Sequence, residues 1–297
     1  MDLKLPELEA AAAVALDPTP VAPGPAADNK QRCQAFLEAI IASAAETWVT
    51  CASFLPATTS TPARFLLLQV LEAAARSEAF PAAGRAHIRG VLMDFVGKNV
   101  DTLPGEAPYV KNKLALLFVL LIRWELLTTW PTAFQDLLTA FSPSPVTMDL
   151  MLRIMTIFDE EVVKATVNNT NKSNAHDQAI KDAMRTGGSV ATLCDCWLRL
   201  LSQANSMPSM AAQCLSTMKE YVAWIDISLL VNDKFMPLLY HFLAHPELRA
   251  PACKCLYELV HKGMDDVSRV QLLATMGIVP HVGGLAFNPA DPVDQGG

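Results

Sequence analysis

Residues 108–127, PYVKNKLALLFVLLIRWELL, decide the fold. Their apolar centre, LALLFVLLI (114–122), is nine residues long and is bounded by Lys113 and Arg123. A helix that crosses a membrane needs about 20 apolar residues, so this run is too short to span one. Pro108 precedes a helical pattern that runs from residue 109 to residue 127. The stretch therefore predicts a helix buried in a protein core.

The composition extends this helical interpretation to the whole chain. Of 297 residues, 52% are hydrophobic and 18% are charged, and only 13 are glycine. Leu and Ala, which have the most favourable helix propensities, dominate long stretches, while the Val, Ile and Thr runs typical of strands are few. The chain is long enough for one large domain or two ordinary ones.

The net charge limits the kinds of partner that the chain can bind. It is −7 at pH 7, with an isoelectric point near 5.4. An acidic chain is a poor general coat for nucleic acid, although a local basic patch within it can still bind phosphate.

The N-terminus does not resemble a targeting signal. Glu7 and Glu9 precede a short apolar segment, whereas a secretory signal carries positive charge there and a mitochondrial transit peptide avoids acids. Seven cysteines, an odd number, fit reduced thiols better than a disulfide framework. We expect no membrane insertion.

Proline and glycine divide the chain into a series of helical patterns. Clear boundaries fall at Thr61-Pro62, Trp130-Pro131, Ser144-Pro145 and Gly187-Gly188. Adjacent helices recur about every 20 residues, so helix pairs recur about every 40, the period of HEAT and armadillo repeats. The predicted fold class is all-α: a HEAT-repeat-like α-solenoid, with antiparallel helix pairs arranged in a superhelix.

No motif for catalysis or for a cofactor is found. Gly97-Lys98 lacks the upstream glycine of a phosphate-binding loop and falls within a helical pattern rather than after a strand. The acidic run 159–161 follows a helical apolar stretch and is typical of solvated acids near a helix end. We expect no catalytic residue, no cofactor and no small-molecule substrate.

The paired cysteines do not predict a metal site. Cys194 and Cys196 are two residues apart, as are Cys253 and Cys255. On a helix such residues point about 200° away from each other, so neither pair can chelate one zinc ion. Semi-buried thiols are the simpler interpretation.

The stretch YVAWIDISLLVNDKF (221–235) carries two acids in an apolar run. On one continuous helix, Asp226 and Asp233 would share a face and suggest a carboxylate pair. The neighbouring patterns instead end one helix near Trp224 and begin the next near residues 232–233. We therefore predict that Asp226 caps a short turn and that Asp233 caps the following helix.

The basic residues allow two interpretations. Lys111 and Lys113 open the 109–127 helical pattern, and Lys172, Lys181 and Arg185 lie in or beside the pattern at 175–186. Lys181 and Arg185 are four residues apart and share one helical face. Such a face is either ordinary and solvated or a site of phosphate contact, whose affinity would depend on salt.

Several blocks, taken in order, carry a family resemblance. They are RFLLLQVLEAAAR (64–76), KNKLALLFVLL (111–121), WPTAFQDLL (130–138), DLMLRIMTIFDEEVV (149–163), AIKDAMR (179–185), YVAWID (221–226) and ACKCLYELVHKGMD (252–265). Together they resemble the N-terminal portion of the tRNA exportins, members of the karyopherin-β (importin-β-like) family. The resemblance covers roughly residues 30–276, and its most specific blocks are YVAWID and KGMD (262–265).

The resemblance implies a nuclear export receptor. Such a receptor binds tRNA cooperatively with Ran-GTP, contacts nucleoporins in the nuclear pore, and shuttles between nucleus and cytoplasm. Catalysis belongs to Ran and its activators, so the receptor itself is not an enzyme. Both ligands are held on the inner face of the solenoid.

The resemblance also implies roles for individual residues. Gln69 and Glu72, in the F-x-x-x-Q-x-L-E pattern of the 64–76 block, would face Ran. Lys111 and Lys113 are assigned with them to Ran, although either partner would suit these lysines.

A second set is assigned to the RNA. Lys172, Lys181 and Arg185 would meet tRNA phosphates. The Asn-rich segment 164–178 departs from the family pattern, which leaves partner contacts there open.

The chain is divided into four segments on this basis. Residues 1–28 form a helix and a Pro/Ala-rich linker, and 29–143 form importin-β/exportin N-terminal-like repeats. Residues 144–276 form further HEAT-like repeats, and 277–297 form an irregular tail. Asn29 is predicted to cap the helix after the linker. Because family members are several times longer, we expect this sequence to be an N-terminal fragment.

Two alternatives remain open. A helical-repeat protein–protein scaffold, or another karyopherin, would lack tRNA binding and would be insensitive to charge reversal at Lys181 and Arg185. An enzyme would need a site assembled between repeats from converging acids or Cys and His ligands.

Overall fold

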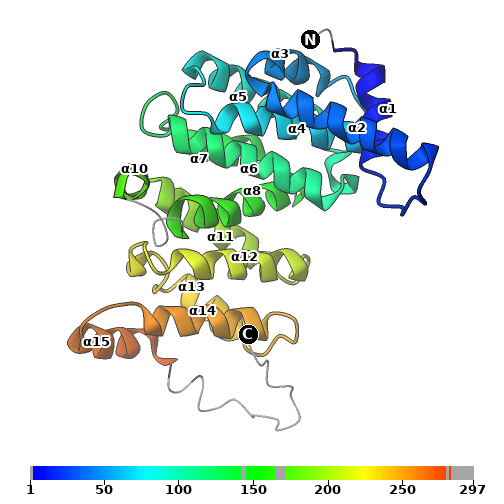
Figure 1. The fold of residues 1–297 in the computed structure, drawn as a ribbon. Helices are drawn as coiled ribbons and strands as arrows, with labels where there is room; N and C mark the ends of the chain where they lie inside the picture. The colour runs from blue at the N-terminus through cyan, green and yellow to red at the C-terminus, as the bar shows by residue number, and fades with distance from the viewer. Residues whose placement is uncertain (1–2, 142–144, 165–170, 279–280, 282–297) are drawn as a thin grey trace. The chain divides into compact units, whose positions relative to one another are not determined.

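The computed structural model describes residues 3–141, 145–164, 171–278 and 281. Within these ranges the chain forms fourteen α-helices, two short 3-10 helices and one π-helix, and no strand (Figure 1). It divides into two compact units, Met1–Thr192 and Leu193–Gly297.

The first unit holds most of the helices. They are α1 (Leu5–Ala15), α2 (Pro25–Ala42), α3 (Ala44–Phe54), α4 (Thr61–Arg76), α5 (Ala82–Lys98), η1 (Leu103–Gly105), α6 (Pro108–Glu125), α7 (Ala133–Phe141), α8 (Pro145–Phe158), η2 (Asp159–Lys164) and α10 (Asn171–Thr186). Helix α11 (Ser189–Ser202) crosses the boundary. The second unit contains α12 (Pro208–Tyr221), η3 (Ile227–Leu229), α13 (Phe235–Phe242), α14 (Arg249–His261) and α15 (Asp266–Met276).

Helices α4, α6 and α8 pack side by side in the first unit (Figure 1). Phe65 and Glu72 of α4 contact Tyr109 and Lys113 of α6, respectively. The contacts advance in the same direction along both helices, so α4 and α6 are parallel. Each parallel neighbour follows one intervening helix, α5 or α7, as expected for a stack of helix pairs.

Each stacked helix also has an antiparallel partner. Arg85 and Arg89, near the start of α5, reach the end of α6, where Arg85 lies 4.5 Å from the Trp124 ring centroid. Arg89 pairs with the buried Glu125 at 2.7 Å. Burial raises the pKa of Glu125, although Arg89 opposes the shift.

The predicted period is visible in the contacts between parallel helices. Glu72 bonds to Lys113 at a separation of 41 residues, and Cys255 bonds to the Leu215 carbonyl at a separation of 40. These spacings match the predicted repeat of about 40 residues, and the predicted fold class, an all-α HEAT-repeat-like α-solenoid, is confirmed.

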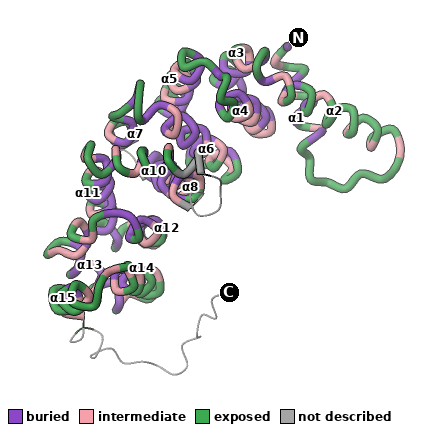
Figure 2. The backbone as a smooth tube through the Cα atoms, turned by 60° about the vertical axis from the view of Figure 1, so that its left-hand side comes forward, coloured by how far each residue is buried: buried purple, intermediate pink, exposed green. Residues whose placement is uncertain are grey.

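The decisive 114–122 stretch is the centre of the first unit. Its residues are buried except for Leu116, which is half-buried, and α6 packs against α4, α5 and α8 (Figure 2). Each fully buried Leu or Phe contributes about 1.5–3 kcal/mol relative to an exposed one. The predicted buried helix is confirmed.

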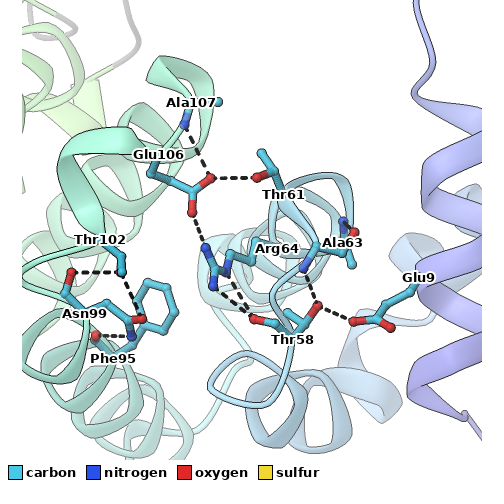
Figure 3. A network of polar contacts seen from close by, with 11 residues as sticks. Glu9, Thr58, Thr61, Ala63, Arg64, Phe95, Asn99, Thr102, Glu106 and Ala107 are labelled. Atoms are coloured by element: carbon cyan, nitrogen blue, oxygen red, sulfur yellow. Dashed lines mark hydrogen bonds and ion pairs between the residues drawn. The ribbon is translucent and has the colours of Figure 1, made fainter.

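A polar network ties the N-terminal helices to this stack (Figure 3). The Thr58 hydroxyl donates to Glu9 of α1 at 2.5 Å, and Arg64 of α4 donates to the Thr58 carbonyl. Arg64 also pairs with the buried Glu106, which accepts a 3.1 Å bond from Thr61. The network joins α1, the start of α4 and Glu106, two residues before α6.

No single helix in the described ranges is long and apolar enough to cross a membrane. Helices α2 and α3 meet the length and composition criteria only when taken together, and they are bent by 105°. Helix α2 begins at Pro25 after Gly24, four residues before Asn29, so the predicted Asn29 cap is wrong. Gly24, at φ 145°, occupies the N-cap position that was predicted for Asn29.

The 221–235 stretch is broken, as predicted. Helix α12 ends at Tyr221, and the Asp226 carboxylate caps η3 by accepting the Ser228 N–H at 2.9 Å. The predicted Asp233 cap is wrong. Asn232 instead accepts the N–H groups of Lys234 and Phe235, at 3.0 and 3.1 Å. Both residues favour helix N-termini, but only Asn232 lies three residues before the first helical residue.

Lys262 closes this corner from the next helix pair. Its ammonium group donates to the carbonyls of Val222, Ala223 and Ile225, at 3.2 Å for Ala223 and 2.8 Å for Ile225. These carbonyls follow the end of α12, where backbone acceptors lack helical partners. The YVAWID and KGMD blocks therefore form one structural joint.

We expect Lys262→Met to lower the free energy of unfolding by about 1–3 kcal/mol, because it removes a charged donor from carbonyls that have few other partners. Urea denaturation followed by circular dichroism measures the loss. Lys98→Met is the matched control, since Lys98 forms only an exposed i,i+4 pair with Asp94 and should cost less than about 0.5 kcal/mol. Equal losses of stability in the two variants would contradict the structural role of Lys262 in this joint.

Candidate partner-binding face

The Ran-assigned residues of the first unit lie on one surface, which we call the α4–α6–α8 face. Its residues are Phe65, Gln69, Glu72, Arg76, Tyr109, Lys111, Asn112, Lys113, Asp149 and Arg153.

Helix geometry explains why these side chains meet. Gln69, Glu72 and Arg76 are spaced three and four residues apart, so they share one face of α4. Lys111 and Lys113 are two residues apart on α6 and point about 200° from each other. Because α6 lies between α4 and α8, Lys113 reaches α4 and Lys111 reaches α8. The four predicted Ran-contact residues are thus brought onto neighbouring helices.

The α4 side of the face is a chain of ion pairs. Glu72 accepts from Lys113 and, at 2.9 Å, from Arg76. Arg76 also reaches Glu161 of η2 at 3.5 Å. Gln69 is half-buried beside this chain. The pairs join α4 to α6 and to the segment after α8.

The α8 side mirrors this arrangement. Lys111 pairs with Asp149 at 3.2 Å, and Asp149 also accepts from Arg153 at 3.0 Å. Arg153 donates to the Asn112 side chain of α6 at 2.6 Å. Every cation of the α4–α6–α8 face therefore contacts a carboxylate, but its four cations share two carboxylates, Glu72 and Asp149, so the face keeps a net positive charge.

Two opposing effects set the protonation of Glu72. Partial burial raises its pKa, but hydrogen bonds and charges from Lys113 and Arg76 outweigh the burial, so the pKa lies below its usual value. Glu72 is consequently ionised at neutral pH and holds both cations in place.

Tyr109 is one of six members of the face that the sequence did not identify. The residue is 48% exposed, and its ring meets Phe65 edge-to-face, with centroids 5.1 Å apart and planes at 87°. One signal was available, because Tyr109 lies outside the apolar 114–122 run and one turn before Lys113.

The tRNA-assigned residues lie on α10. Lys181 and Arg185 stand one turn apart there, and Arg185 bonds to Asp182 at 2.6 Å. Lys181 is half-buried, and no ion pair to it occurs in the part of the chain that the structure describes. Lys172 is placed in α10, but its side chain lies outside the described residues.

The structure does not bring the two predicted sites together. Helix α10 is anchored to the end of α6 through Arg123, which pairs with the buried Asp177 at 3.0 Å and whose carbonyl meets His176 at 2.8 Å. Lys113 lies ten residues earlier on α6, about 15 Å along the helix axis. The residue assignments to Ran and tRNA stay predictions.

The cysteines and acids were also candidates for a metal site or for nucleophiles. No group of three His, Cys, Asp or Glu side chains there is placed to hold a metal ion. Burial raises the pKa of Cys194 to about 12 and that of Cys196 to about 11, so these thiols are protonated and poor nucleophiles at neutral pH.

Stacked helix pairs with a polar face define the chain as a helical-repeat protein. A family described as "Exportin 1-like protein" matches residues 107–256, half of the chain. The chain belongs to this exportin 1-like family.

Individual relatives extend the match over most of the chain. Exportin-T of Danio rerio is 32% identical over 252 residues, 83% of this chain and 26% of that protein. Exportin-T of Dictyostelium discoideum is 34% identical, covering 86% of this chain and 23% of its own length, and exportin-T of Homo sapiens is 31% identical, covering 92% and 29%. The resemblance predicted from the quoted blocks is confirmed, and the chain spans about a quarter of the length of these relatives.

The lowered pKa of Glu72 predicts how stability depends on pH. A carboxyl whose pKa is lower in the folded chain stabilises the fold above its unfolded pKa, about 4.3, and loses this contribution as pH falls through the folded value. We expect Glu72→Gln to lower the free energy of unfolding by about 1 kcal/mol at pH 7. This difference from wild type should shrink below pH of about 4.3.

Urea denaturation at a series of pH values tests this expectation. Glu46→Gln, at an exposed position of α3, is the control. Its free energy of unfolding should stay close to that of wild type at every pH. A Glu72→Gln difference that stays constant into acid would contradict the ion-pair explanation.

Proposed function

We propose that this chain is the N-terminal part of a nuclear export receptor that binds tRNA cooperatively with Ran-GTP. The observation that carries the proposal is the similarity to exportin-T over 83–92% of the chain in the three relatives. The receptor would shuttle between nucleus and cytoplasm and contact nucleoporins on the way. GTP hydrolysis would belong to Ran, so the chain itself would perform no reaction.

The pairing of cations with carboxylates on the α4–α6–α8 face supports a protein partner there. A nucleic-acid surface neutralises phosphates with cations that lack counter-charges, and it gains affinity by releasing bound ions. On this face, Lys111, Lys113 and Arg76 each contact a carboxylate. Ran would find partners of both signs, which favours specificity and orientation over raw affinity.

Helix α10 is the better candidate for tRNA. Lys181 presents a positive charge without a carboxylate partner among the described residues. Arg185 shares its side of the helix, although Asp182 offsets part of its charge. We expect Lys181 to contribute more to phosphate binding than Arg185.

The two sites lie at opposite ends of α6, so direct contact between their side chains does not explain cooperativity. Coupling would instead arise from conformational ordering. Each ligand would offset part of the conformational entropy that is lost when the helix stack adopts one arrangement. A coupling of this kind is reciprocal, so tRNA would raise the affinity for Ran-GTP by the factor by which Ran-GTP raises the affinity for tRNA.

A protein–protein scaffold is the second candidate, and the paired charges of the α4–α6–α8 face favour it. A scaffold would bind no tRNA, and its behaviour would not change on charge reversal at Lys181 and Arg185. These expectations separate it from the export receptor.

The proposal predicts that Ran-GTP increases tRNA binding by this chain. Filter binding of labelled tRNA is measured at several salt concentrations, with Ran-GTP, with Ran-GDP and without Ran. Lys181→Ala should reduce the slope of log affinity against log salt by about one, because one phosphate contact is lost. Lys254→Ala, in α14, is the matched control and should leave the slope unchanged.

Two outcomes would count against the proposal. Equal tRNA binding with Ran-GTP and Ran-GDP would contradict cooperativity. Absence of tRNA binding, together with no effect of the double charge reversal at Lys181 and Arg185, would favour the scaffold.

A further inference from the structure

Tyr109 is an exposed aromatic residue that its surroundings hold in place. It is the second residue of α6, after Pro108, and nearly half of its surface is accessible. Its ring lies edge-to-face on Phe65 of the neighbouring α4. Because helix α6 and Phe65 already restrict the ring, little side-chain entropy would be lost when a partner covers it.

Paired polar groups surround this ring. Lys113, one turn along α6, lies 5.6 Å from the centroid of Phe65 while its ammonium group bonds to Glu72. Asn112, on the same turn, is held by Arg153 of α8. Interface hot spots have this composition: a large aromatic at the centre and satisfied polar groups that exclude water around it.

The pairing of the charges selects the class of partner. A platform for nucleic-acid bases combines aromatic rings with cations that follow the phosphate backbone. Here Lys113 contacts Glu72, and Lys111 contacts Asp149, so neither lysine is free to follow a phosphate backbone. A folded protein with an apolar pocket and charges of both signs at its rim fits this surface better than RNA.

We propose that Tyr109 is the anchor residue of the α4–α6–α8 face and inserts into an apolar pocket of the GTP-bound Ran partner. Phe65 acts as a positioning residue that supports the Tyr109 ring from below. This inference rests on the proposed function, because it takes its partner from there.

The test measures the affinity of the 297-residue chain for Ran-GTP by isothermal titration calorimetry. Tyr109→Ala should weaken binding about thirty-fold or more, the effect of truncating a hot-spot residue. Tyr109→Phe keeps the ring and should stay within about threefold of wild type. Tyr257→Ala removes a tyrosine that is 57% exposed on α14 and should leave the affinity unchanged.

Three other outcomes would overturn the assignment of Tyr109 as the anchor. An unchanged affinity for Tyr109→Ala, with wild type binding Ran-GTP, would overturn the anchor and leave the proposed function standing. An equal loss in Tyr257→Ala would overturn it too, since the effect would not be specific to the face. If wild type does not bind Ran-GTP, the proposed function fails and the anchor fails with it.

RNA binding is tested separately in the absence of Ran. Tyr109→Ala should bind tRNA as wild type does. A weaker tRNA affinity in this variant, with circular dichroism and thermal unfolding unchanged, would show that the α4–α6–α8 face is an RNA surface and would overturn the proposal.

Discussion

The first unit depends on the close packing of α6 between α4 and α8. The 114–122 run is almost completely buried, so α6 has apolar side chains facing neighbours on several sides. A helix that is hydrophobic nearly all round is stable only when it is enclosed. Enclosure by parallel neighbours about 40 residues away in sequence forces the repeat. The period, the helix order and the polar faces follow from this burial.

Parallel packing also dictates the electrostatics. When α4, α6 and α8 run in the same direction, charged residues at similar heights are brought within bonding distance at the edge of the core. Lys113 contacts Glu72, and Lys111 contacts Asp149, because both lysines lie just before the apolar run of α6. These pairs are partly buried, and removing one partner would leave a poorly solvated charge. The pairing of charges on the face is therefore a consequence of the stack, and any ligand must bind a surface whose cations already contact carboxylates.

Periodicity predicted the fold because burial is periodic in a helix. The apolar run, the proline starts and the repeat length could all be read from single residues and their spacing. One of the two cap errors arose where neighbouring residues have the same local chemistry. Asn232 and Asp233 both suit a helix start, and the geometry of one residue decides between them. The site was predicted less well, because the pairing of Arg76 with Glu161 and the exposure of Tyr109 depend on tertiary packing that no local pattern records.

The two most distinctive sequence blocks have a structural role. Lys262 of the KGMD block bonds to three carbonyls of the YVAWID corner, and Asp226 fixes the short helix that follows. A lysine that serves several backbone carbonyls cannot be replaced by an apolar or acidic residue without leaving acceptors unpaired. Such joints constrain sequence strongly at a few positions. A partner-binding face made of ion pairs constrains the sequence weakly. The Coulomb energy of a Lys–Glu pair is similar when the lysine and the glutamate are exchanged. The blocks that identify the family and the residues that bind its partners therefore need not be the same.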